Sequence, residues 1–132
     1  MSKTNYQSMT VDELFSVLQE AAIKAHEVYV AGDPIEKQHA WVDILTSAYE
    51  EIQTRGDDAL QRYIPLLEAP HPAVRLSAAL GAQDLALELA VPVLEDLSDG
   101  KYGGTIGVNA GMTLDGMRKR GLLPPEKSGT RA

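Results

Sequence analysis

The 132-residue chain has 44% apolar and 23% charged residues, an ordinary composition for one globular domain. It contains no cysteine, which excludes a disulfide scaffold, a thiol nucleophile, an iron–sulfur cluster and a thiolate zinc site. The net charge of −7 is uneven: residues 1–100 carry six basic and 17 acidic side chains, whereas residues 101–132 carry six basic and two acidic ones. An acidic body repels phosphate backbones, so we expect no binding to nucleic acid.

The chain shows no targeting or membrane signal. Its first residues lack the apolar core of a signal peptide, and no apolar run approaches the length that spans a bilayer. We therefore expect a cytoplasmic protein that does not bind membranes. We predict a disordered lead-in over residues 1–9, a single helical domain over residues 10–122 and a disordered tail over residues 123–132.

Two long helices are predicted first. The segment 10–13 has the spacing of a capping box, and apolar residues then recur every three or four positions until Gly32 ends the helix. Asp33 and Pro34 are expected to cap and begin a second helix, which runs to about Arg55 and has a wider apolar face.

Two shorter helices follow. The third covers about 58–68, with Asp57 as its cap and Pro65 bending its interior, because proline removes a backbone hydrogen bond. The fourth covers about 73–82 and is rich in alanine, which allows neighbouring helices to approach closely.

A fifth helix, capped by Asp84, and a final helix over about 105–120 complete the predicted set. Glycines 107, 111 and 116 weaken the final helix by about 1 kcal/mol each relative to alanine. No segment alternates with period two, so no strand is predicted. The fold class is all-α, a short stack of antiparallel helical hairpins with about six helices.

Residues 66–79, together with Pro65 just before them, resemble the core of a HEAT repeat. In that family a proline-bent first helix is followed by a turn and by a second, alanine-rich helix that opens with Val-Arg, which matches Pro65, Val74 and Arg75. The family usually has an acidic residue in the turn where this chain has His71.

A partial echo of this pattern occurs 27 residues later, where Pro92 lies in Ala90–Leu94 as Pro65 lies in Tyr63–Leu67. The resemblance covers residues 60–100 clearly, and the whole chain is similar to small, uncharacterised bacterial HEAT-like proteins. It implies a HEAT-like α–α superhelix and no particular activity.

One pair of residues has the spacing of a metal site. Glu36 and His39 follow the Glu-x-x-His pattern that places a carboxylate and an imidazole on one helical face. A di-iron bundle needs a second such pair, and the other match, Glu68 and His71, is broken by Pro70. We therefore expect no metal or cofactor. A metal-binding bundle or an enzyme that uses Glu36, His39 and nearby carboxylates is the alternative hypothesis.

The glycine-rich run from Tyr102 to Gly111 partly resembles a phosphate loop. It lacks the Gly-Lys-Ser/Thr ending, and no predicted strand precedes it. We interpret Gly103–Gly111 as an interhelical loop whose permissive backbone could contribute to a partner site. The serines lack a nucleophile motif and the histidines are scattered, so we predict no enzymatic activity.

Acidic residues gather in two clusters that could form a partner surface. Neither has the ligand spacing of an EF-hand, so exposed helix ends and a surface that docks basic side chains are the two interpretations. The clusters are Glu50, Glu51, Asp57 and Asp58, and Glu95, Asp96 and Asp99. Trp41 and Tyr49 are expected to anchor the core, although either would suit an interface if exposed.

We therefore predict a non-enzymatic protein–protein interaction module. Its partner is unknown. A basic protein fits the acidic body, as in an immunity or antitoxin-like protein that masks a basic toxin. A homodimer is a further alternative, because the end of a hairpin stack can leave an apolar face uncovered. A HEAT-like reader of DNA lesions fits the acidic chain poorly.

Overall fold

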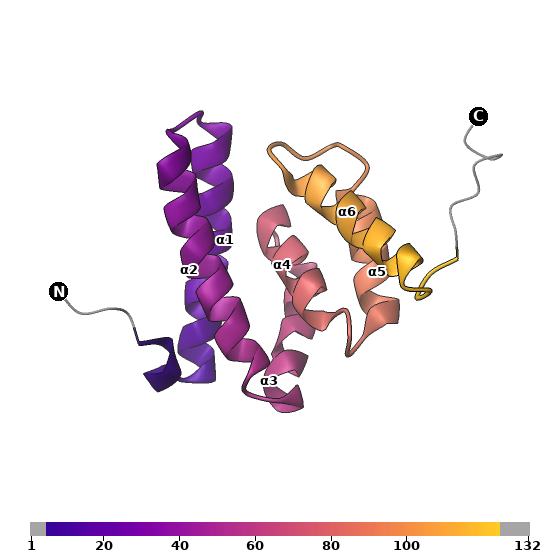
Figure 1. The fold of residues 1–132 in the computed structure, drawn as a ribbon, viewed down its shortest axis with the longest axis horizontal. Coiled ribbons are helices and arrows are strands. Elements are labelled where there is room, and N and C mark those ends of the chain that lie inside the picture. The colour runs from indigo at the N-terminus through magenta and orange to yellow at the C-terminus, as the bar shows by residue number, and fades with distance from the viewer. Residues whose placement is uncertain (1–4, 125–132) are drawn as a thin grey trace.

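The computed structural model describes residues 5–124, and within them it contains six α-helices, two 3-10 segments and no strand (Figure 1). This arrangement confirms the predicted all-α fold class. The elements in chain order are η1 (Tyr6–Ser8), α1 (Val11–Val30), α2 (Ile35–Gln53), α3 (Asp57–Leu60), η2 (Gln61–Glu68), α4 (Pro72–Ala82), α5 (Leu87–Leu97) and α6 (Ile106–Lys119).

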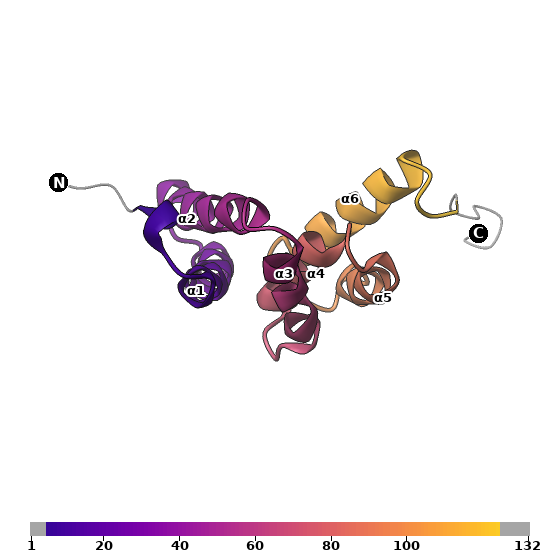
Figure 2. The same ribbon diagram turned by 90° about the horizontal axis from the view of Figure 1, so that it is seen from below.

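The helices pair as three consecutive hairpins. α1 pairs with α2, the α3–η2 segment pairs with α4, and α5 pairs with α6. Between hairpins, α4 packs on α1, α5 and α6, and η2 packs on α5. Figure 2 shows α2 and α6 on the same side of the molecule, with α4 between them. α4 is therefore the central helix, in contact with all three hairpins.

Leucines and alanines build one continuous core. Tyr63 of η2, Leu94 of α5 and Met117 of α6 are among its fully buried large side chains. The alanines of α4 are buried nearly completely, which allows its neighbours to approach closely. These small side chains help α4 to occupy the central position, in contact with helices of all three hairpins.

The helix starts agree only partly with prediction. The capping box of α1 is present: the Thr10 hydroxyl accepts from Glu13 N at 3.1 Å, and Glu13 accepts from Thr10 N at 2.8 Å. The predicted caps Asp33, Asp57 and Asp84 are wrong, because none accepts a hydrogen bond from the helix that follows. Asp33 instead forms an ion pair with Lys37, and Asp84 lies in a turn two residues ahead of the Ala86 cap.

The third predicted helix is not a regular α-helix. Four residues of α3 lead into the 3-10 segment η2, which contains Pro65. Proline has no backbone N–H and its ring crowds the preceding turn, which disfavours a regular α-helix here, although α5 accommodates Pro92 within an α-helix. The glycine before α3, Gly56, has φ 90°, a conformation that lets the chain turn sharply out of α2.

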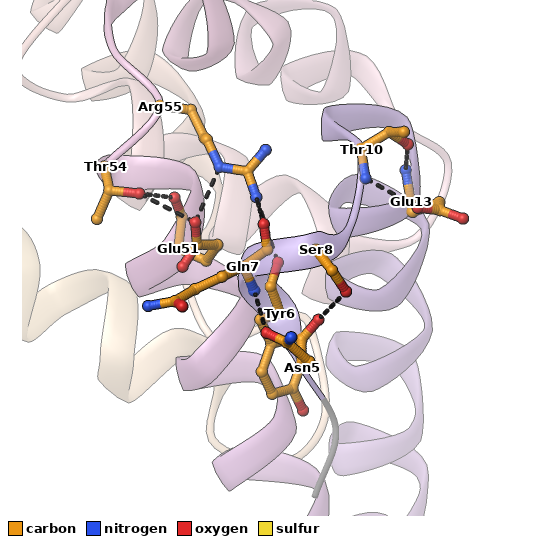
Figure 3. Close-up of polar contacts among 9 residues, drawn as sticks. All are labelled: Asn5, Tyr6, Gln7, Ser8, Thr10, Glu13, Glu51, Thr54 and Arg55. Atoms are coloured by element: carbon orange, nitrogen blue, oxygen red, sulfur yellow. Dashed lines mark hydrogen bonds and ion pairs between the residues drawn. The ribbon is translucent and has the colours of Figure 1, made fainter.

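Residues 5–9 form a structured turn, in contrast to the predicted disordered lead-in. Arg55 at the end of α2 donates from Nη2 to the carbonyl oxygens of Tyr6 and Gln7, at 3.2 Å each (Figure 3). Ser8 Oγ also donates to Asn5 O at 2.9 Å. Residues 1–4 of the lead-in and 125–132 of the predicted tail lie outside the described residues. Leu123, also placed in that tail, packs against the core.

Candidate functional site

The first acidic cluster is divided between a structural role and a free surface. Glu51 Oε2 accepts from Arg55 Nε at 2.8 Å and from Thr54 Oγ1 at 3.2 Å (Figure 3). The charge of Glu51 is therefore paired with Arg55, the residue that donates hydrogen bonds to η1. Glu50, Asp57 and Asp58 are exposed and have no ion pair within residues 5–124.

The second acidic cluster is largely neutralised by its own neighbours. Lys101 Nζ lies 2.5 Å from Asp96 Oδ1 and 3.7 Å from Asp99 Oδ2. The Tyr102 hydroxyl donates to Asp96 Oδ2 at 2.8 Å and accepts from Arg75 Nη2 at 3.0 Å. The hydrogen bonds from Lys101 and Tyr102 hold the pKa of Asp96 below its usual range.

The seven predicted acidic residues do not form one surface. Figure 1 shows α3 at one end of the molecule and the loop that joins α5 to α6 at the other. Glu50 and Asp57 lie at the first end, whereas Asp96 and Asp99 lie near the second. Glu95 is exposed on α5 and has no ion pair among the described side chains.

A row of acidic residues on α2 extends the first cluster, and although Glu36 and Glu50 were named from the sequence, their alignment with Asp43 was not recognised there. Glu36, Asp43 and Glu50 are seven residues apart and all exposed. Side chains seven apart lie on the same side of a helix, because seven residues make nearly two turns. None of the three forms an ion pair in the described part of the chain. The row could have been found by counting heptads along α2.

A groove borders the same helix. It consists of two adjoining cavities of about 170 and 270 Å³ that share Leu45 and Ser77. We call it the α2–α6 groove. Its floor comes from α4 and its walls from α1, α2 and α6, and its residues are Ala22, Ala25, His26, Gln38, Val42, Leu45, Thr46, Tyr49, Ala73, Leu76, Ser77, Leu80, Gln83, Thr105, Ile106 and Asn109.

Ser77 and Tyr49 place polar groups along this mostly apolar groove. Ser77 is 7% exposed, lines both cavities, and its hydroxyl makes no hydrogen bond within residues 5–124. Tyr49 is half-buried against the core and donates to Leu80 O at 3.3 Å. Trp41, predicted as a core anchor, is only half-buried and lies outside the central hydrophobic cluster.

The structure confirms the predicted final helix over about 105–120, and the interpretation of Gly103–Gly111 as a loop is therefore wrong in its second half. α6 begins at Ile106, which is buried, so Gly107 and Gly111 are helical. Gly104 lies close against α1, because a Cβ at this position would be 2.9 Å from His26 Nδ1. The segment therefore packs one end of the third hairpin against α1.

The sequence is similar to one recognised family. The model of the family described as Domain of unknown function (DUF2019) matches residues 12–118. The chain belongs to this family. The DUF2019 match spans α1 to the last turn of α6 and so includes both the acidic row and the groove. No curated protein matches the chain.

A solved structure has the same fold as this DUF2019 chain. It is the crystal structure of the protein RPA1889 from Rhodopseudomonas palustris, with a TM-score of 0.77 and 23% sequence identity. The match covers 94% of this chain and 100% of the other. At this level of identity the likeness establishes the shared helical architecture.

The DUF2019 chain does not bring the predicted metal-site residues together with further ligands. Glu36 and His39 are both exposed on α2. Among the residues that the structure describes, no group of three or more His, Asp and Glu side chains could hold a metal ion. Every helix in the same range is also too short or too polar to cross a membrane.

Proposed function

We propose that this protein is a non-enzymatic interaction module whose acidic surface binds a basic protein. The surface comprises Glu36, Asp43 and Glu50 on α2 and Asp57 and Asp58 on α3. The observation that carries the proposal is that these five carboxylates are exposed and have no counter-charge within residues 5–124.

The contrast with other acidic residues supports this choice. Glu51, Asp96 and Asp99 have cationic partners of their own, so a ligand would have to compete for them. A row of unpaired charges attracts a basic partner without that competition and also accelerates its association. An immunity or antitoxin-like protein, in which this surface masks a basic toxin, is one form of the proposed function.

We also infer that the hairpins are HEAT-like. Pro65 interrupts the first helix of the second hairpin, and Arg75 near the start of α4 donates to Ala69 O and Pro70 O at 2.8 and 3.0 Å. The arginine thus holds the turn between the two helices. His71 lies at the position where HEAT repeats usually have an acidic residue. It caps α4 through Nδ1, which accepts a hydrogen bond from Ala73 N at 3.1 Å.

Affinity capture at two ionic strengths tests the proposed function. The tagged chain is incubated with native lysate of its source at low salt and again at about 0.5 M salt, and bound proteins are identified by mass spectrometry. A basic protein should be retained in stoichiometric amount at low salt and lost at high salt. If no such protein is retained at low salt, the proposal is wrong.

A charge-reversal variant links capture to the proposed surface. Replacing Asp57 and Asp58 with lysine should weaken retention of that basic protein by about ten-fold, since charges at an interface rim contribute about 1 kcal/mol each at most. The matched control replaces Glu68 and Glu88, which are exposed on other elements and unpaired in the described structure, and should retain the partner as the unmodified chain does.

A further inference from the structure

The exposed side of α2 has a heptad pattern that its own neighbours cover only in part. Ile35, Val42 and Tyr49 are seven residues apart, and Gln38, Leu45 and Ile52 form a second row three residues further on. Such a pair of rows forms the contact face of a helix that packs lengthwise against another helix.

Burial of the apolar members of these rows decreases from the end of α2 to its start, while the polar Gln38 is half-buried. Ile52 is fully buried, Tyr49 and Leu45 are half-buried, and Val42 and Ile35 are 37% and 52% exposed. The first half of α2 therefore has an apolar face that lacks a helical partner among the described residues. This face continues directly into the α2–α6 groove, because Val42, Leu45 and Tyr49 line it.

The acidic row borders the other side of the same face. Glu36, Asp43 and Glu50 each follow one residue after Ile35, Val42 and Tyr49, and one residue turns the helix by about 100°. A helix lying on the apolar face thus has the groove on one flank and the carboxylates on the other. Glu50 lies 14 positions after Glu36, so the row extends over about 21 Å of helix.

From this arrangement we propose that the face of α2 and the α2–α6 groove receive an amphipathic helix of another protein. The helix inserts apolar side chains into the groove beside Leu45 and Leu80 and places Lys or Arg, at seven-residue intervals, against Glu36, Asp43 and Glu50. A polar side chain of the incoming helix reaches the hydroxyl of Ser77, a residue that is 7% exposed and lines both cavities. The inference rests on the proposed function and specifies its ligand.

Charge favours a different protein over a second copy of this chain. The exposed cations at the end of α6, Lys119 and the cap residue Arg120, are consecutive, and the exposed Lys24, Lys37 and Arg62 on other helices each pair with an acidic residue of this chain. They lack the seven-residue spacing of the acidic row. A second copy is therefore kept as an outcome of the test that would contradict the proposal.

Site-specific photo-crosslinking tests the groove directly. A benzophenone amino acid is placed at Val42 in one variant and at Leu89 on α5 in the control, since both positions are exposed. After irradiation in native lysate, the crosslinked peptide is sequenced by mass spectrometry. We expect Val42 to capture a segment with an apolar heptad pattern and Lys or Arg seven residues apart, and Leu89 not to capture it.

Binding of the captured segment, as a synthetic peptide, then measures the contribution of each flank. Fluorescence anisotropy should show about ten-fold weaker binding for V42D and for the triple variant E36K/D43K/E50K. The matched controls L89D and E20K/E68K/E88K, at exposed positions outside the groove, should bind within about two-fold of the unmodified chain. Circular dichroism verifies that each variant keeps its helical content.

Three outcomes would overturn the groove proposal. They are a crosslink from Val42 to a second copy of the chain, a captured segment without the stated pattern, and no crosslink at Val42 while affinity capture still retains a basic protein. The last result would leave the proposed function intact and place the partner elsewhere. Failure of affinity capture itself would instead remove the proposed function.

Discussion

Tyr63 and Gly81 meet in the core, and their contact explains why α4 contains a glycine. Tyr63 is fully buried, with its ring edge-on to Phe15 at a centroid distance of 4.8 Å. A Cβ added to Gly81 would lie 2.4 Å from the Tyr63 ring, closer than van der Waals contact permits. Gly81 is therefore required by packing, although glycine is unfavourable in a helix.

Replacing Gly81 with alanine should lower the free energy of unfolding by about 1–3 kcal/mol, the usual range for an overpacked core. Gly116 in α6 is the matched control, because nothing lies within 4 Å of its Cβ position and its φ is not positive. G116A should raise stability by up to about 1 kcal/mol through helix propensity. Urea denaturation of both variants measures the difference, and equal effects would contradict the packing argument.

Tyr63 also buries a hydroxyl group without a hydrogen-bond partner in residues 5–124. Burial raises the pKa of Tyr63 above its usual range. A buried hydroxyl without a partner loses its hydrogen bonds to water and gains none in the protein. Y63F should therefore leave the free energy of unfolding unchanged or raise it by about 1 kcal/mol. A loss of more than about 1 kcal/mol in chemical denaturation would show that the hydroxyl is hydrogen-bonded in solution.

At the scale of single elements, α4 depends on a titratable cap. The His71 ring lies edge-on to His26 of α1, with centroids 5.6 Å apart, and its Nδ1 accepts from Ala73 N. Burial lowers the pKa of His71, as do the nearby His26 and Arg75, whereas Glu27 of α1 opposes the shift. A proton on Nδ1 would remove the acceptor that caps the helix.

Stability should consequently fall as the solution is acidified. The pKa of His71 is lower in the folded chain than its ordinary value of 6.5, so between the two values the unfolded chain binds more protons. The contribution of His71 is then fully present above about pH 6.5 and lost as the pH falls toward the folded-state pKa.

Thermal denaturation from pH 7 to 5 checks this prediction with two variants. H71N keeps a capping side chain that does not titrate, so it should remain folded with a smaller dependence on pH. H71A removes the cap as well and should cost about 1 kcal/mol at neutral pH. An unchanged pH dependence in H71N would rule out His71 as the source.

The helix positions and the capping box of α1 could be predicted from sequence, whereas the starts of α2, α3 and α5 could not. The apolar steps of three and four residues in α1 and α2 depend on neighbours within one turn, which the sequence displays directly. Capping depends on the backbone conformation of the preceding residue. Asp33, Asp57 and Asp84 have suitable side chains, yet the chain places each of them outside the capping position.

On the scale of the whole molecule, one chain of polar contacts joins the second and third hairpins. Arg75 of α4 contacts the Tyr102 hydroxyl, and Tyr102 contacts Asp96 of α5. The arginine also lies over the Tyr102 ring, 5.5 Å from its centroid. Tyr102 thus links α4 to the loop that follows α5.

Y102F should keep the ring contact and lose both hydrogen bonds. Because the site is partly buried, we expect a decrease of about 0.5–1.5 kcal/mol in the free energy of unfolding, measured by urea denaturation. Tyr29, which is 44% exposed and makes no side-chain hydrogen bond among residues 5–124, provides the control variant Y29F. Similar losses in both variants would show that the hydroxyl of Tyr102 contributes nothing specific.

The candidate site was less predictable than the fold, because it depends on distances between separate segments. Val42 and Ser77 are 35 residues apart in the chain and line the same groove. Neither the groove nor the pairing of Asp96 with Lys101 follows from spacing alone. The acidic residues themselves were evident from sequence, but which of them keep a free charge is decided by the cations that folding brings near.

The Arg55 contacts with Tyr6 and Gln7 have a practical consequence for recombinant forms of this protein. Arg55 follows Tyr6 by 49 positions and Gln7 by 48, so these hydrogen bonds join the end of the first hairpin to the η1 turn that precedes it and close a non-covalent ring. A reporter or purification handle fused ahead of Asn5 leaves that ring intact. A version trimmed to begin at Thr10 would open it and release the guanidinium from both carbonyl groups.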